Sequence, residues 1–272
     1  MAPRYLVNCS ILFTELPLLD RPAAARAAGF EAVEFWWPFD RAVPTNSAVA
    51  EFVAAVRDAG VRLAGLNFVA GDLAAGERGL VSWPGRSEEF RAGVAVAVSI
   101  GRQLDVPAFN ALYGNRLPGA DPAEQDALAV GNLAYAAAAA ARIGATVLVE
   151  PVSGVPAYPL KTAADVLAVI DEVRAVHGCE NVRLLADLYH LSVNGDDVPA
   201  MIAAHAGEVG HVQIADAPGR HQPGTGTLPI PAYLDALTAA GYDGWFSLEY
   251  VPEGPSADSF GWLPAGATQV RS

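Results

Sequence analysis

Apolar segments recur at fairly regular intervals along the chain, with longer amphipathic stretches between them. The short segments are apolar throughout rather than alternating, as in Val147-Leu148-Val149. Continuous apolar runs are typical of parallel strands that are buried on both faces. We therefore predict strands at residues 5–9, 32–35, 62–68, 108–112, 146–150, 182–187, 210–214 and 244–249.

The stretches between these strands carry helix start and stop signals. Asp121-Pro122 combines a capping side chain with a first-turn proline, Ser87 opens another helix, and Thr14 with Leu16-Pro17 precedes the first. Glycines follow the helices, where a left-handed C-cap is favoured, at Gly29, Gly60, Gly101, Gly144, Gly178 and Gly241. The chain therefore reads as a repeated strand–helix unit.

Eight strands with helices between them predict a closed (β/α)8 barrel. The alternative, a doubly wound sheet, usually has a glycine-rich first turn, whereas this chain has Asn8-Cys9-Ser10-Ile11-Leu12 there. A length of 272 residues fits one such barrel. We expect one domain over 1–272, with the Pro/Gly/Ser-rich tail 252–272 lying over a barrel face or against another subunit.

Composition excludes several classes of protein. Hydrophobic residues make up 52%, which rules out a disordered chain. Lys and Arg total 17 against 30 Asp and Glu, a net charge of −13, which argues against nucleic acid and anionic membrane surfaces as partners. Lys161 is the sole lysine, which argues against a Schiff-base or P-loop mechanism. Cys9 and Cys179 lie too far apart to indicate a disulfide framework or a thiolate zinc cluster.

The first residues lack the long apolar run of a signal peptide. The most apolar run, 133–141, is far shorter than the ~20 residues that span a membrane. We therefore expect a soluble, cytoplasmic protein.

A polar residue stands at the end of every predicted strand. In a barrel of this kind, functional side chains project from the C-terminal ends of the strands. Those ends carry a carboxylate or a carboxamide in each case, and together they predict a polar ring around one cavity: Asn8, Glu34, Asn67, Asn110, Glu150, Asp187, Gln213 and Glu249.

The last four members of this ring indicate a metal site. Glu150, Asp187 and Glu249 would repel one another in a dry cavity and take up protons, and a divalent cation removes that conflict. With the amide oxygen of Gln213 they form a hard-oxygen set suited to Mg²⁺ or Mn²⁺, with Co²⁺ or Zn²⁺ as alternatives. The competing interpretation is that some of them cap helices or pair with arginine.

Candidate substrate contacts flank the ring. Three residues are expected to contact substrate oxygens: His190, Asn67 and Asn110. Arg220 lies in the stiff, polar loop 216–226 and could bind a substrate carboxylate as a bidentate fork, or be an ordinary surface arginine. The loop 70–86 is either a lid or an ordinary long connection.

Aromatic residues follow several strands, where they either wall the cavity or pack in the core: Phe13, Phe35, Trp36, Trp37, Phe68 and Tyr113. Three other histidines are interpreted as structural. His177 and His205 fall at helix ends, and His211 is expected to pack on the far side from the site.

The chain resembles the hydroxypyruvate isomerase family, within the xylose-isomerase-like TIM barrels, over nearly its whole length. The segment 210–226 is the most specific part of the match. The other matching stretches are 11–15, 33–35 with 38–40, 71–79, 84–86, Glu150-Pro151, Asp187-Leu188-Tyr189-His190, 241–245 and 248–250.

The resemblance implies interconversion of hydroxypyruvate and tartronate semialdehyde. It implies one metal among residues matching Glu150, Asp187, Gln213 and Glu249, with Glu150 and Glu249 as the proton donor and acceptor. Such a shift of a carbonyl between adjacent carbons passes through an enediolate and needs a base and an acid beside it. The chain has Ser153 where the family often has Asn, and Val251 where it often has Lys, which bears on the substrate.

Other functions fit the same barrel. A 2-oxo-tetronate isomerase would act on a four-carbon sugar acid. Ketose 3-epimerases tend to carry His where this chain has Gln213. A polyol dehydratase would share the same barrel. A non-enzymatic barrel that binds sugar acids would not need two proton-transfer acids. A multi-zinc nuclease would need more than five histidines and a basic surface. The expected partner is a small 2-oxo or hydroxy acid, and a homo-oligomer is compatible with the tail.

Overall fold

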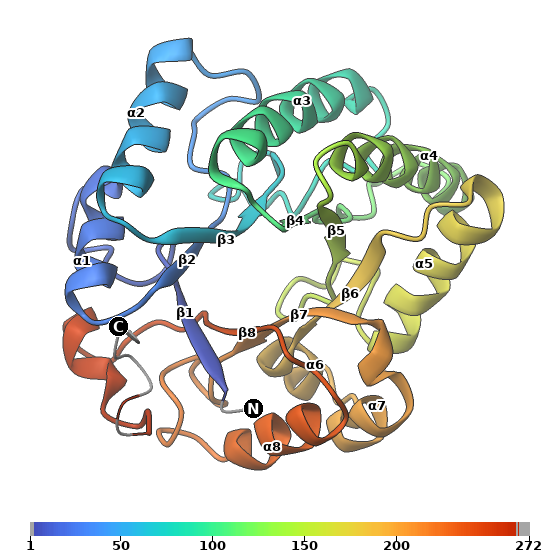
Figure 1. Ribbon diagram of the computed structural model, residues 1–272. Coiled ribbons are helices and arrows are strands. Elements are labelled where there is room, and N and C mark those ends of the chain that lie inside the picture. The colour runs from blue at the N-terminus through green and yellow to red at the C-terminus, as the bar shows by residue number, and fades with distance from the viewer. Residues whose placement is uncertain (1–2, 265, 267–272) are drawn as a thin grey trace.

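The barrel is closed, and all eight strands run parallel in chain order. The computed structural model describes residues 3–264 and 266. Figure 1 shows the strands in a ring with the helices outside. The strands are β1 Arg4–Asn8, β2 Ala32–Phe35, β3 Arg62–Asn67, β4 Ala108–Asn110, β5 Thr146–Val149, β6 Val182–Asp187, β7 Val209–Ile214 and β8 Trp245–Leu248. The predicted (β/α)8 barrel is confirmed.

Helices connect the strands on the outside of the barrel. They are α1 Arg21–Ala27, α2 Asn46–Asp58, α3 Ser87–Leu104, α4 Pro122–Ala141, α5 Ala163–His177, α6 Leu188–Val193, α7 Val198–His205 and α8 Ile230–Ala239, with short 3-10 turns η1 Leu18–Asp20, η2 Ala206–Glu208 and η3 Ser256–Phe260. None of the helices in the described part of the chain is long and apolar enough to cross a membrane.

The predicted helix signals are mostly correct. Asp121 caps α4 by accepting from the backbone N–H of Ala123, and Ser87 opens α3. The prediction for Gly101 is wrong, because α3 continues past it to Leu104 and ends at Asp105 in a left-handed conformation. Gly101 is instead buried where a side chain would collide with the ring of Phe109, so this position needs a small residue for packing.

The barrel interior is built in layers. Side chains two residues apart on a strand point to the same face. Counting back two residues from the polar ring therefore gives the layer beneath it, which is buried and mostly apolar: Leu6, Ala32, Ala108, Leu148, Leu185, His211 and Ser247. The opposite faces of the strands pack against the helices and form the main hydrophobic core.

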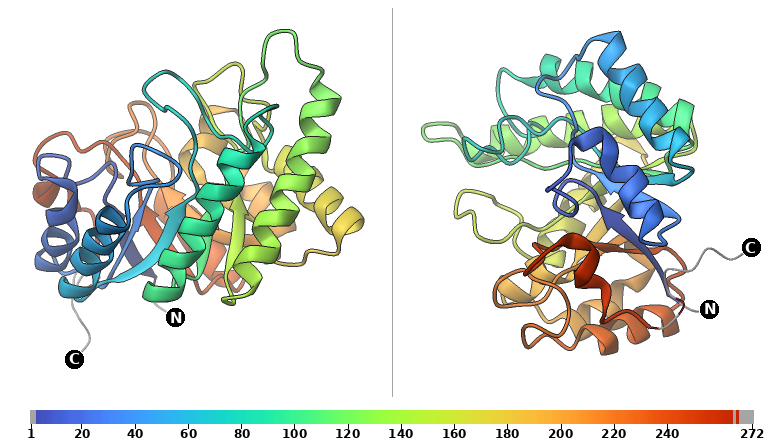
Figure 2. Two further views of the ribbon diagram at one scale, coloured as in Figure 1. Left: turned by 90° about the horizontal axis from the view of Figure 1, so that it is seen from above. Right: turned by 90° about the vertical axis from the view of Figure 1, so that its left-hand side faces the viewer.

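The two ends of the barrel differ. Figure 2 shows the long strand-to-helix loops gathered at one end, with the N-terminus at the other. The described part of the tail lies against the first strand–helix unit, because Phe260 packs on Phe13 and Phe30 and Trp262 meets Tyr5 edge-on. The remainder of the predicted tail, 265 and 267–272, lies outside the described residues.

Candidate active site

All eight residues of the predicted polar ring are buried at the loop-bearing end of the barrel. Asn8, Asn67, Asn110 and Asp187 are the last residues of their strands. Glu150 and Glu249 come directly after β5 and β8. One sequence pattern, an apolar strand that ends in a carboxylate or carboxamide, therefore predicted which polar side chains are buried at this end.

Glu34 is the centre of a hydrogen-bond network at the base of the site. Its Oε1 accepts from Asn8 Nδ2 at 2.9 Å, Gln213 Nε2 at 2.8 Å and Ser247 Oγ at 2.6 Å. Its Oε2 lies 2.6 Å from His211 Nε2. Burial by itself would raise the pKa of Glu34, but His211 and the other donors lower it below the usual value. Glu34 is thus a structural anion that orients the amides above it.

The prediction for His211 is wrong in its placement. His211 does not face away from the site but points into the barrel interior and pairs with Glu34. It stands two residues before Gln213 on β7, so strand periodicity puts both on the inner face. This two-residue spacing from Gln213 could have predicted an inward-facing His211 from the sequence. The prediction failed because it considered only the position of His211 near the start of its strand.

Glu249 is held from three sides. Asn8 Nδ2 donates to its Oε2 at 2.8 Å, and Gln213 Nε2 donates to the same oxygen. Arg220 Nη2 donates to its Oε1 at 2.6 Å. Burial raises the pKa of Glu249 against the opposing influence of Arg220. These contacts fix the carboxylate in one orientation.

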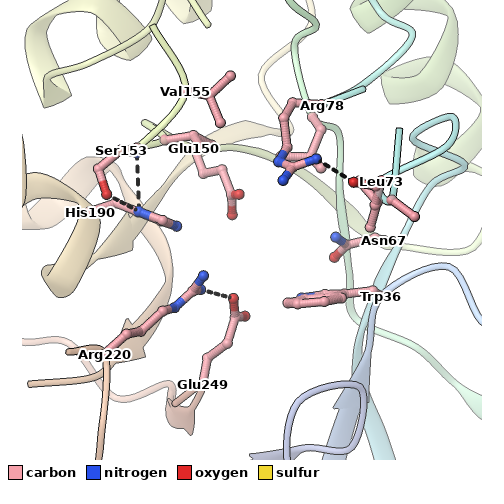
Figure 3. A pocket seen from close by; sticks show the side chains of 14 residues that line it. Trp36, Asn67, Leu73, Arg78, Glu150, Ser153, Val155, His190, Arg220 and Glu249 are labelled. Carbon is pink, nitrogen blue, oxygen red and sulfur yellow. Dashed lines mark hydrogen bonds and ion pairs between the residues drawn. The ribbon is translucent and has the colours of Figure 1, made fainter. Parts of the chain in front are cut away.

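Glu150 is less constrained. Asn110 Nδ2 donates to its Oε2 at 2.8 Å, and burial together with the nearby Asp187 raises its pKa to about 8. Figure 3 shows the carboxyl groups of Glu150 and Glu249 directed into the same space from different sides. The site therefore presents two carboxyl groups in different environments to one cavity.

His190 is neutral and has a defined tautomer. The backbone N–H of Ser153 donates to His190 Nδ1 at 3.1 Å, so the ring proton sits on Nε2. That nitrogen lies 3.6 Å from Asp187 Oδ2 and faces the cavity. Burial lowers the pKa of His190 to about 4. His190 can therefore act as a neutral hydrogen-bond donor through Nε2.

Ser153 gains a role from this contact. Its Oγ lies 2.7 Å from His190 Nδ1, beside the backbone contact. Because Nδ1 accepts, the hydroxyl donates to it. Ser153 therefore helps to orient the ring of His190.

Arg220 reaches the site from a loop that one carboxylate organises. Asp216 is buried, and it accepts hydrogen bonds from four backbone N–H groups of the loop, those of Ala217, Gly224, Gly226 and Leu228, at 2.8 to 3.0 Å. Although burial tends to raise it, these donors lower the pKa of Asp216. Arg220 itself adopts a left-handed backbone conformation, with φ 58°. The loop thus has a fixed shape that delivers one guanidinium group to Glu249.

A cavity of about 440 Å³ opens above the ring. Its wall includes Glu150, Glu249, His190, Arg220, Asn67 and Trp36, and, from the loops, Leu73, Ala74, Arg78, Leu112, Val152, Ser153, Gly154 and Val155. Of the aromatic residues expected at the wall, only Trp36 lines this cavity, since Phe35 packs on Phe52 and Phe68 stacks on Phe109.

The four predicted metal ligands lie close together but are not arranged as a ready-made cage. Among the described residues, no three His, Cys, Asp or Glu side chains converge closely enough to hold an ion as they lie. Arg220 Nη2 instead lies between two of them, 2.6 Å from Glu249 and 3.8 Å from Asp187. Gln213 Oε1 is buried and has no hydrogen-bond partner among the described residues. The site thus already has one cation and one unused oxygen.

The predicted substrate contacts separate in the structure. Asn67, His190 and Arg220 line the cavity, whereas Asn110 is turned to Glu150. Arg78 also lines the cavity, opposite Arg220 (Figure 3), although it was not among the predicted substrate contacts. His177 and His205 are the last residues of α5 and α7, as expected.

Comparison with known proteins places this site in a family. The profile of the xylose isomerase-like TIM barrel matches residues 22–265. The chain is 56% identical to a putative hydroxypyruvate isomerase of Streptomyces coelicolor, with 98% of each chain covered. It is 37% identical to a 2-oxo-tetronate isomerase of Cupriavidus necator, covering 96% of this chain and 97% of that one. It is 33% identical to the hydroxypyruvate isomerase of Escherichia coli, covering 96% and 98%. The chain therefore belongs to the hydroxypyruvate isomerase family of the xylose isomerase-like TIM barrels, and it is an isomerase.

Proposed function

We propose that this isomerase interconverts hydroxypyruvate and tartronate semialdehyde, with Glu150 and Glu249 as the proton-transfer groups. The observation that carries the proposal is the pair of buried carboxyl groups facing one cavity from different strand ends (Figure 3). An isomerisation of this kind needs a base to remove a carbon-bound proton and an acid to return one to the neighbouring carbon. Two such groups in unlike surroundings can share these roles.

The reaction moves hydrogen within one molecule and needs no external oxidant. A base takes a proton from the hydroxymethyl carbon of hydroxypyruvate, which leaves an enediolate across two carbons. A proton is then delivered to the former carbonyl carbon, while the hydroxyl proton moves between the two oxygens. Arg220 and the Nε2–H of His190 face the cavity as donors to these oxygens, where negative charge develops.

The roles of the two carboxyl groups follow from their contacts. Glu249 accepts hydrogen bonds from Arg220 and Asn8, which oppose the rise in its pKa that burial causes, and we assign it as the base that starts the reaction from hydroxypyruvate. Glu150, whose pKa is raised to about 8, holds a proton near neutral pH and suits the acid. In the reverse direction the roles exchange.

A divalent ion is part of the proposal. The buried, unpartnered Gln213 Oε1 is an oxygen donor of the kind that Mg²⁺ and Mn²⁺ accept, and it stands beside Glu249. Burial raises the pKa of Glu150 and Glu249, so the site favours uptake of further positive charge. Glu150, Asp187, Gln213 and Glu249 would hold the ion. When bound, the ion would stabilise negative charge on the substrate oxygens.

A four-carbon substrate is the second candidate, and the cavity has room for it. At roughly 30 Å³ per water-sized unit, a volume of about 440 Å³ holds more than the seven non-hydrogen atoms of hydroxypyruvate. The relative from Cupriavidus necator is a 2-oxo-tetronate isomerase. The proton-transfer groups would act in the same way on either acid.

Proton exchange in D₂O tests the proposed function. Hydroxypyruvate and 2-oxo-tetronate are each incubated with the enzyme, and ¹H NMR follows loss of the carbon-bound proton and appearance of the aldehyde. We expect deuterium at the exchanging carbon together with isomer formation for at least one of the two acids. Neither exchange nor product with either acid, with and without Mg²⁺ or Mn²⁺, would refute the proposal.

A further inference from the structure

Arg78 presents an unused pair of donors to the cavity. It is partly buried and lines the wall opposite Arg220 (Figure 3). Its Nη1 donates to the carbonyl oxygens of Leu73, at 2.9 Å, and Glu77, at 2.7 Å. Within the described chain, Nε and Nη2 have no protein partner. These two nitrogens share one edge of the guanidinium, the fork that binds a carboxylate through two parallel hydrogen bonds.

The acidic neighbour of Arg78 is held by a different arginine. Glu77 Oε2 accepts from Arg86 Nη1 at 2.8 Å and from the backbone N–H of Asp72 at 2.7 Å. In the part of the chain that the structure describes, no carboxylate lies within ion-pair distance of Arg78. Its positive charge is therefore uncompensated, although the whole chain carries a net charge of −13. An unpaired guanidinium in the wall of a cavity is a site for an anion.

The backbone that carries Arg78 has a fixed shape. Gly79 has φ 110°, and a side chain at this position would collide with the carbonyl group of Leu112. The N–H of Gly79 donates to Ala70 at 2.9 Å, and Asn115 Nδ2 donates to the carbonyl oxygen of Gly76 at 2.9 Å. These contacts close the loop on itself and against the next one. Arg78 is therefore held at the cavity by contacts within the protein.

The charge of Arg220, in the opposite wall of the cavity, is already shared with acids, although its Nε has no hydrogen-bond partner among the described residues. Arg220 Nη2 lies 2.6 Å from Glu249 and 3.8 Å from Asp187, so its charge is shared with two buried acids. A substrate carboxylate brought to Arg220 would compete with them. At Arg78 it would meet no competing carboxylate from the described residues, which makes the opposite wall the more favourable place for the charged end of the substrate.

We propose that Arg78 is the receptor for the substrate carboxylate and that it selects 2-oxo acids over neutral sugars. Arg220 then remains beside Glu249, at the oxygens of the reacting carbons. The inference rests on the proposed function in so far as the ligand is a small 2-oxo acid. It replaces the sequence-based assignment of the carboxylate to Arg220.

A neutral analogue separates recognition of the charge from the chemistry. Dihydroxyacetone has the same carbonyl and hydroxymethyl groups as hydroxypyruvate, but a second hydroxymethyl group replaces the carboxylate. Kinetics with hydroxypyruvate and deuterium exchange into dihydroxyacetone are measured for wild type, Arg78→Gln and Arg78→Lys. Arg142→Gln is the matched control, because Arg142 is exposed at the end of α4, away from the cavity.

For Arg78→Gln we expect KM for hydroxypyruvate to rise about 10- to 100-fold, the loss typical of hydrogen bonds to a charged group, with little change in kcat. The KM of Arg78→Lys should lie between those of wild type and Arg78→Gln, because lysine keeps the positive charge but cannot form two parallel hydrogen bonds. Exchange into dihydroxyacetone should stay as in wild type. An equal loss with both compounds would show that Arg78 only supports the loop, and would overturn the inference.

Equilibrium binding keeps this test independent of turnover. Glycerate carries the carboxylate but has no carbonyl group, so it cannot isomerise. We expect calorimetry to show glycerate binding to wild type and the Arg142→Gln control, and about 10- to 100-fold weaker binding to Arg78→Gln. If no isomerisation is found but this difference holds, the proposed function fails and the carboxylate receptor stands. Unchanged binding in Arg78→Gln, or none in wild type, would refute the receptor.

Discussion

Asp216 is expected to control both the stability of the protein and the position of Arg220. Its two carboxylate oxygens each accept two backbone N–H groups of the loop, and the side chain is 1% exposed. Asp216→Asn preserves the size of the side chain but replaces one oxygen with an NH₂ group. Whichever way the amide turns, two of the four N–H groups then face a donor instead of an acceptor.

The magnitude follows from the number of unsatisfied donors. Each buried donor left without a partner costs about 1–3 kcal/mol, so two give a loss of roughly 3 kcal/mol in the free energy of unfolding. For a protein near this size, about 2–4 °C of melting temperature corresponds to 1 kcal/mol. We therefore expect Asp216→Asn to melt roughly 6–12 °C below wild type. It should also lower kcat/KM, because the loop that carries Arg220 loses its organising anion.

The dependence on pH has a definite sign. The pKa of Asp216 is lowered in the folded protein, so its stabilising effect is fully present above the unfolded pKa of ~3.9 and disappears as the pH falls through the lower folded value. Thermal melts of wild type and Asp216→Asn should therefore differ by a constant amount between roughly pH 5 and 8 and converge only in stronger acid.

An exposed aspartate of the following helix provides the control for this experiment. Asp235 lies on the solvent side of α8, and Asp235→Asn should melt within about 1 °C of wild type. If Asp216→Asn melts as high as this control and retains its kcat/KM, the carboxylate does not organise the loop and the reasoning is wrong.

Three further predictions concern the ring and the layer beneath it. Glu150→Gln and Glu249→Gln should each lower kcat about 10²- to 10⁴-fold with a smaller change in KM, measured by steady-state kinetics; a variant that keeps a tenth of the turnover would indicate a single base. Gln213→Ala should weaken Mn²⁺ binding in calorimetry by about 10-fold or more, and an unchanged affinity would remove Gln213 from the ligand set. A double-mutant cycle of Glu34→Gln and His211→Gln, measured by urea unfolding, should give an interaction energy of at least ~1 kcal/mol, since the two groups lie 2.6 Å apart. If the two losses in the free energy of unfolding are additive, the pair makes no stabilising interaction.

The strands and the polar ring could be predicted because both depend on local sequence. A continuous apolar run predicts a buried parallel strand, and the first polar residue after it marks the catalytic end of the barrel. Glu150 shows this well, since it follows three buried residues of β5 and opens into the cavity. The same reasoning extended by two residues would have placed His211 inside the barrel.

The loop residues could not be placed in this way, because their positions depend on contacts that are distant in sequence. The loop 216–228 takes its shape from one carboxylate that binds N–H groups up to 12 residues away. Arg78 is left without a carboxylate partner because Arg86 pairs with Glu77. The backbone at the next residue, Gly79, lies against the carbonyl group of Leu112. Local sequence patterns do not predict which of these side chains contact one another.

The division between strands and loops also explains the electrostatics of the site. The barrel strands bring Glu34, Glu150, Asp187 and Glu249 to one end, all buried, and His211 lies beside the lowest of them, Glu34. The loops supply the opposing charge, with a guanidinium beside Glu249 in one wall and an unpaired one in the opposite wall. A substrate that is an anion at one end and an enolisable carbonyl at the other matches this separation, because its charge and its reacting carbons are drawn to different walls. Exchanging loops on this scaffold should therefore change which acid is accepted, while the proton-transfer groups stay in place.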